Sequence, residues 1–167
     1  MVALILAAAL GLPANCTGCS FARRDLHGAD LSGVSFVGVD FDRANLRDAN
    51  FSNAKLTGVD FGRADLRGAD FSGANLTGVD MTGAQLAGAR FGGTNFAGAD
   101  LHGDDLENLD FSRDGLEGVD FSSSDLRGAD LRGVLVCHGS RGTPSCEEID
   151  TATLRRESRS SLDGAIL

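Results

Sequence analysis

Four cysteines are the residues of this chain best suited to covalent chemistry, and they stand in two pairs near its ends. Cys16 and Cys19 have the Cys-x-x-Cys spacing of redox-active dithiols and metal sites, and Cys137 and Cys146 form the second pair. A zinc site needs four ligands, and dithiol redox chemistry is typical of a thioredoxin-like strand and helix. Neither setting surrounds these cysteines, although His138 adjoins Cys137, so structural disulfides are favoured.

Aspartates that recur at intervals of twenty residues are the second feature with possible chemistry. They are Asp40, Asp60, Asp80, Asp100 and Asp120. Carboxylate oxygens in a row are suitable ligands for a hard cation such as calcium. Aspartates can equally well stay solvated and accept hydrogen bonds from the backbone of their own turns. We expect the second behaviour and keep the row as a candidate cation ladder.

No set of residues predicts catalysis. The three histidines fall at unrelated positions, and the chain has no HExxH, GxSxG or Walker-type phosphate loop. We therefore expect no catalytic residue, no cofactor and no enzymatic activity.

A large apolar residue stands at every fifth position from Phe21 to Val136, and this series includes all ten phenylalanines. The series sets the positions of all the polar groups named above. A period of five fits neither an amphipathic helix nor a regular strand. It fits a short extended step, a corner and a repeat of both. A small residue, usually Ala or Val, lies two positions earlier and points to the same side as the large one. Gly is common two positions later, where a corner needs a permissive backbone.

A second period, of twenty residues, shows how the steps close into coils. Gly-Val-Asp-Phe occurs at 38–41, 58–61 and 118–121, so four pentapeptides make one coil. Identical side chains then stack from coil to coil. The expected core stack contains Phe41, Phe61, Met81 and Phe121 in one column and Leu46, Leu66 and Leu86 in the next. The predicted fold is an all-β solenoid, a right-handed quadrilateral β-helix of about six four-sided coils, roughly 28 Å long at ~4.8 Å per coil.

The repeats at 29–33, 64–68 and 74–78 resemble the A(D/N)LXX signature of the pentapeptide repeat family, and the resemblance extends over residues 20–136. It implies a right-handed quadrilateral β-helix and no enzyme activity. The best-understood members are quinolone-resistance proteins, whose acidic rod-like dimers resemble DNA and bind DNA gyrase. Others are lumenal or periplasmic proteins of no settled role. An apolar leader followed by Cys16 and Cys19 is more similar to the exported group.

The two ends of the chain depart from the repeat. Residues 1–15 contain an apolar run typical of a signal-peptide core, although no Lys or Arg precedes it, and an apolar N-terminal cap is the alternative. The β-helix is expected over 16–136, and 137–167 should form a C-terminal cap with a short helix from about Cys146 to Arg156. A rod between the two cysteine pairs exceeds the reach of a disulfide. The expected bonds are therefore Cys16–Cys19 and Cys137–Cys146.

Several repeats carry an unusual residue at the small inward position. These are Arg24, Thr94, Asp104, Leu109, Asp114 and Ser124. A buried carboxylate needs hydrogen-bond partners or an altered pKa. We expect a local distortion of the coil near residues 102–116 more than a ligand site.

Charge on the outside of the predicted rod is mixed. The chain has a formal net charge of −9 and a pI near 4.6. A basic stripe runs through it, made of Arg23, Arg43 and Arg63 beside His27, Arg47 and Arg67. The stripe either interleaves with nearby acids for solubility or docks an anionic partner.

These features predict a non-enzymatic, exported scaffold that binds a protein, as a monomer or as a homodimer through a solenoid end. Nucleic acid is not an expected partner, because its binding needs clustered basic residues. No membrane contact is expected once a signal peptide is removed. The alternative is a cytoplasmic DNA-mimicking binder of DNA gyrase or another topoisomerase. Against it, the rod would carry about one net charge per ~3.5 Å, half the density of duplex DNA.

Overall fold

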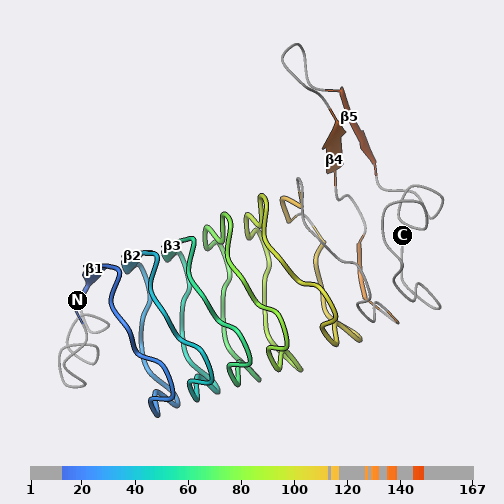
Figure 1. The fold of residues 1–167 in the computed structure, drawn as a ribbon. Helices are drawn as coiled ribbons and strands as arrows, with labels where there is room; N and C mark the ends of the chain where they lie inside the picture. Colours follow the sequence, from blue (N-terminus) through green and yellow to red (C-terminus); the bar gives the residue numbers. More distant parts are fainter. Residues whose placement is uncertain are drawn as a thin grey trace.

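The chain winds into a rod of stacked, four-sided coils (Figure 1). The computed structural model describes residues 13–112, 114–116, 127 and 129–131, together with the backbone of residues 135–138 and 145–148. The fold is the right-handed quadrilateral β-helix that the repeat predicts. We number the coils from the first column, so that coil 1 is 21–40, coil 2 is 41–60, coil 3 is 61–80, coil 4 is 81–100 and coil 5 begins at 101.

Parallel pairing at intervals of twenty residues holds successive coils together. On one side of the rod it is regular enough to form strands β1 (Asn15–Thr17), β2 (Ser35–Val37) and β3 (Lys55–Thr57). Cys16 lies opposite Phe36, and Phe36 lies opposite Leu56. On the other sides the pairing consists of isolated bridges such as Asp40↔Asp60 and Asn45↔Asp65. Each flat side is only two or three residues wide because a corner follows, so longer strands cannot form.

The large residues fill the centre of the rod in columns. The side chains of Phe41, Phe61, Met81, Leu46 and Leu66 are all fully buried. The Phe41 and Phe61 rings stack at 5.4 Å with 5° between their planes, which places them on the same wall, one coil apart. Leu86 is also buried, whereas Phe121 lies outside the described residues. The described members of the expected core stack thus all lie in the interior of the rod.

The corners need a left-handed backbone. Gly28 and Gly38 have φ values of 65° and 59°, a region that other residues adopt only under strain. The small residue before each large one closes the corner from inside, as Ala44 and Ala64 do. Arg24 is an exception, because it turns outward, is exposed, and holds its guanidinium 5.8 Å from the centre of the Phe21 ring.

Strands β4 (Leu135–His138) and β5 (Ser145–Glu148) pair in antiparallel fashion beyond the last described coil (Figure 1). Their register sets Cys137 opposite Cys146. The predicted helix from about Cys146 is wrong at its start, because residues 145–148 form a strand. The rest of that predicted helix lies outside the described residues. So do residues 1–12, Asp120 and Ser124. No helix among the described residues has the length and apolar character needed to cross a membrane.

Candidate functional site

The first cysteine pair is part of the solenoid. Cys16 stands five residues before Phe21 and faces inward as one more large position, buried at 9% exposure. Cys19 stands two residues before Phe21, at a small inward position, and packs against the core. The structure joins the two sulfur atoms in a disulfide with Cα atoms 6.0 Å apart. The bond therefore crosses an inner corner of the first turn, whereas the sequence placed both residues just outside it.

A basic edge runs along the N-terminal half of the rod, and it consists of Arg23, Arg43, Arg63, His27, Arg47 and Arg67. Its first three members occupy left-handed corners, with φ values of 59°, 56° and 57°. The same corner carries Gly83 and Gly103 in the next two coils. A left-handed backbone costs a non-glycine residue about 1 kcal/mol or more. Three successive coils thus keep an arginine where the backbone favours glycine.

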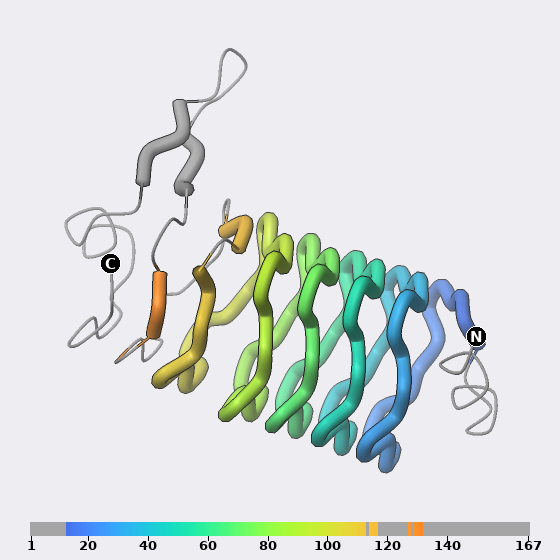
Figure 2. The backbone as a smooth tube through the Cα atoms, turned by 180° about the vertical axis from the view of Figure 1, so that it is seen from behind, coloured from blue at the N-terminus to red at the C-terminus, as the bar shows by residue number. Residues whose placement is uncertain are grey.

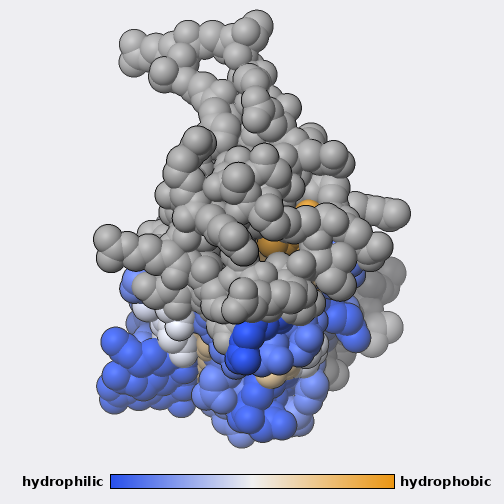
Figure 3. All heavy atoms as spheres, turned by 90° about the vertical axis from the view of Figure 1, so that its right-hand side faces the viewer, coloured by the Kyte–Doolittle hydropathy of each residue, from blue (hydrophilic) through white to orange (hydrophobic). Residues whose placement is uncertain are grey.

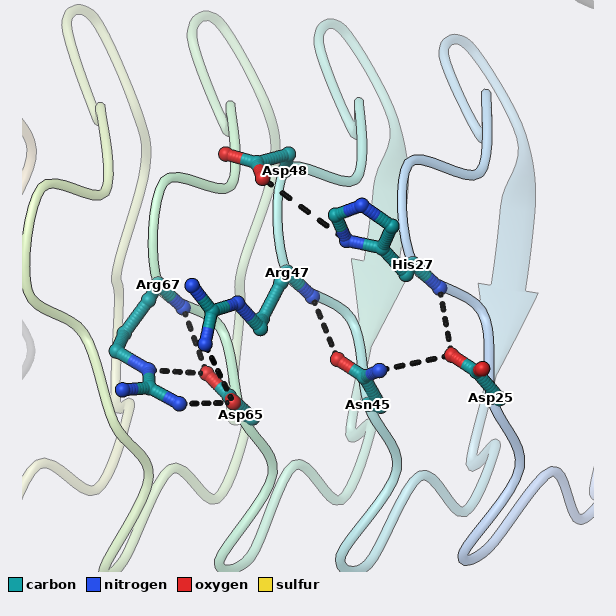
Figure 4. A network of polar contacts seen from close by, with 7 residues as sticks. All are labelled: Asp25, His27, Asn45, Arg47, Asp48, Asp65 and Arg67. Atoms are coloured by element: carbon teal, nitrogen blue, oxygen red, sulfur yellow. Dashed lines mark hydrogen bonds and ion pairs between the residues drawn. The ribbon is translucent and has the colours of Figure 1, made fainter.

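Two aspartates bridge the arginines of this edge from coil to coil. The Asp42 carboxylate lies 3.2 Å from a guanidinium nitrogen of Arg43 and 3.2 Å from one of Arg63. Asp65 accepts hydrogen bonds from Arg67 at 2.8 and 2.5 Å and lies 3.9 Å from Arg47 (Figure 4). The hydrogen bond from Arg67 is the main reason why the pKa of Asp65 lies below its ordinary value.

The rest of the edge is held by polar contacts that repeat the coil spacing (Figure 4). The Asn45 side chain donates to Asp25 at 2.8 Å, and His27 Nδ1 lies 3.9 Å from Asp48. The Arg47 and Arg63 side chains are 46% and 63% exposed, so solvent or a partner can still reach both guanidinium groups. The edge is therefore a row of guanidinium groups interleaved with aspartates, as one of the two expectations for this stripe had it, and part of each guanidinium stays accessible.

The candidate cation ladder is used by the fold itself. Asp40, Asp60, Asp80 and Asp100 each accept a hydrogen bond from the backbone amide two residues later, at 2.7–2.9 Å. Asp40 also accepts from the Ser20 hydroxyl at 2.9 Å. No group of three or more metal-ligating side chains occurs within the described part of the chain. These aspartates therefore act as turn-forming residues.

Two carboxylates lie inside the rod, as the inward position predicts. Asp104 and Asp114 are 2% and 4% exposed. The Gly83 amide donates to Asp104 Oδ1 at 2.6 Å, and the Thr94 amide donates to Asp114 Oδ1 at 2.8 Å. The Oδ2 atom of each is buried with no partner in the described part of the molecule. Burial raises the pKa of both to about 7, and the Asp100 and Asp80 charges add to this at Asp104.

Pentapeptide repeats are matched in eight copies over residues 14–48, 44–83, 80–113 and 116–135. The chain therefore belongs to the pentapeptide repeat family, whose members are typically structural or binding proteins, and no catalytic family is indicated. No curated protein matches the sequence.

Solved structures with the same fold include the full-length plasmid-mediated fluoroquinolone resistance protein QnrB1. It is 22% identical, with a TM-score of 0.59 over 92% of this chain and 81% of that one. A pentapeptide repeat protein from the thylakoid lumen of Arabidopsis thaliana is 30% identical over 73% of this chain and 68% of that one, with a TM-score of 0.38. Rfr23 from the cyanobacterium Cyanothece 51142 is 23% identical over 72% of this chain and 96% of that one, with a TM-score of 0.47. The likeness to QnrB1 shows the fold alone.

Proposed function

We propose that the protein is an exported, non-enzymatic scaffold that binds an acidic protein surface along its basic edge. The observation that carries the proposal is the row of Arg23, Arg43 and Arg63 in left-handed corners, where glycine would cost less. Coils 1 to 3 each contribute one arginine at this corner. The row therefore presents guanidinium groups at the coil spacing with little backbone freedom to lose on binding.

The remainder of the rod suits a scaffold. Its core is continuous from Cys16 to Leu116, so the sides keep their shape without a metal or cofactor. The outer side chains visible in the end-on view of Figure 3 are mainly hydrophilic, which favours a charge-guided contact over an apolar one. Arginine also suits carboxylate partners because its planar fork can bind both oxygens at once.

The edge is tested with a photo-crosslinking residue at Ala87, an exposed position in the column of Arg47 and Arg67, and with a matched one at the exposed Val37 on another side. We expect a crosslinked protein partner from Ala87 alone, and we expect R43E with R47E to abolish it. Arg90 lies outside the basic edge and pairs with Asp70 at 2.7 Å. It supplies the control variant R90E. Crosslinking that survives R43E with R47E, or that is equal from Val37, contradicts the proposal.

Export is proposed on the apolar leader and on the two cysteine pairs, which fit an oxidising compartment. The mature N-terminus and the number of free thiols in the denatured protein test it. We expect the chain to be cleaved near residue 15. We also expect two disulfides, Cys16–Cys19 and Cys137–Cys146. An intact Met1 with four free thiols would exclude export. A gyrase supercoiling assay would then test the DNA-mimic alternative.

A further inference from the structure

The coils of the rod are bonded unequally, and the weak place is the junction between coils 4 and 5. Between coils 3 and 4, Leu66 donates its amide to Gln85 at 2.9 Å and Phe71 donates to Arg90 at 2.7 Å. Within the fully described stretch 84–112, the equivalent amides of Leu86 and Phe91 donate to no carbonyl of coil 5. Gln85 still faces Asp105 in register, but the Asp70↔Arg90 bridge has no continuation from Arg90 to Asp110.

Among the described residues, the walls on either side of these two keep their pairing. On the wall before them along the chain, Met81 donates to Asp100 at 2.9 Å, and on the wall after them Phe96 donates to Gly115 at 2.7 Å. Beyond the junction, Phe111 donates to Asp130 at 2.8 Å. Coils 4 and 5 lie in the yellow-green and yellow part of the tube, and the described segment 129–131 follows them toward the C-terminus (Figure 2). The junction is thus not a frayed end.

The two buried aspartates stand at the two corners that bound the weakened walls. In coils 1 to 3 the corner amides of Arg23, Arg43 and Arg63 donate to a backbone carbonyl of the next coil. In coil 4 the Gly83 amide donates instead to the Asp104 carboxylate. At the far corner the Thr94 amide keeps its bond to the Phe91 carbonyl within the coil and also donates to Asp114 of the next coil. A side chain therefore stands between the two backbones at both corners, where Ala is usual.

Packing and access change at the same place. Ala84 and Ala89 are 6% and 7% exposed, whereas their counterparts Ala64 and Ala69 in coil 3 are fully buried. A hollow of about 190 Å³ opens beside Ala84, and its other lining residues are Arg67, Gln85, Leu86, Ala87 and Asp105. The Phe91 and Phe111 rings nevertheless stack at 5.5 Å. The junction is open at its backbone and closed at its core.

We propose that this junction is a conformational seam, at which the rod opens and closes while coils 1 to 4 stay intact, and that Asp104 and Asp114 are the wedges that keep it weak. In a repeat protein each coil contacts only its neighbours, so stability is a sum of neighbouring interfaces and the weakest one opens first. The seam separates the basic edge from the C-terminal coils. It lets these two parts of the rod change their relative direction without unfolding either.

Hydrogen–deuterium exchange of the full chain at constant pH tests the seam by comparing peptides over 86–93 with peptides over 46–53, two coils earlier. We expect exchange about tenfold faster or more over 86–93. The variant D104A with D114A restores the usual small residue and should slow 86–93 to the rate of 46–53. The variant D104N with D114N keeps both the size and the oxygen that accepts the amide, so its exchange should remain fast.

Three results overturn the proposal. One is equal exchange over 86–93 and 46–53 in the unmodified protein. The second is fast exchange over 86–93 that persists in D104A with D114A. The third is slow exchange in the asparagine variant, since the effect would then come from charge and not from a wedge.

Discussion

The buried carboxyl groups of Asp104 and Asp114 should make the protein less stable as the pH rises toward neutrality. Each pKa is raised from 3.8 to about 7 in the folded chain. The folded state therefore holds these protons over a range in which the unfolded chain has lost them. The stabilising contribution is complete below about pH 3.8 and is lost as the pH rises through about 7.

The magnitude follows from the shift. One pKa unit corresponds to about 1.4 kcal/mol, so each carboxyl changes the free energy of unfolding by about 4 kcal/mol over the full range. Between pH 5 and pH 7 the change is about 2 kcal/mol for each group. Both groups are nearly inaccessible to solvent, so screening reduces this little.

Urea unfolding at several pH values from 5 to 8 measures the effect. The unmodified protein should lose several kcal/mol over this range, and D104N with D114N should show a much smaller slope, because asparagine does not titrate. D105N alters an exposed neighbour and should keep the full slope. Parallel pH profiles for the unmodified protein and the double variant would refute the reasoning.

Three further predictions concern the core, the corners and the first coil. F61A removes a fully buried ring that contacts Phe41, Phe51 and Phe71. It should therefore lower the free energy of unfolding, measured in a denaturant titration, by about 3–5 kcal/mol. A loss below about 1 kcal/mol would contradict the columnar core. G68A and G78A each add a Cβ to a left-handed corner, at φ values of 72° and 64°, and each should cost about 1 kcal/mol, because the exposed Asp48 side chain near residue 68 can move aside. Unchanged melting temperatures in both variants would count against left-handed corners. In a C137S, C146S background, reduction of Cys16–Cys19, a bond that closes a very short loop, should lower stability by about 2 kcal/mol. An unchanged denaturation midpoint after reduction would contradict the contribution of this bond.

The five-residue and twenty-residue periods were enough to predict the columns, the corners and the buried positions. They also placed Asp104 and Asp114 inside the rod and predicted a distortion nearby. All of these positions depend on whether a side chain faces into or out of the rod, and the place of a residue within its repeat gives that direction. The inward role of Cys16 was missed, although it stands five residues before Phe21 and so continues the series.

Other features depend on geometry that a period does not contain. The strand at Ser145–Glu148 replaces the start of the expected helix, because pairing with Leu135–His138 outweighs a local capping pattern. The left-handed backbone of Arg43 could be inferred only from its alignment with Gly83, since arginine itself does not favour it. The lost pairing of Leu86 and Phe91 follows from side chains at distant corners, and no local signal marks it.

The twenty-residue pairing register, seen where Cys16 lies opposite Phe36 and Phe36 opposite Leu56, limits how genes for such proteins can change length. Loss or duplication of a whole turn shortens or lengthens the shaft and leaves every later side chain facing its former direction. An insertion of a single pentapeptide preserves the inward positions yet rotates everything downstream by one wall. Small genetic steps can thus redirect one half of the surface relative to the other without disturbing the interior.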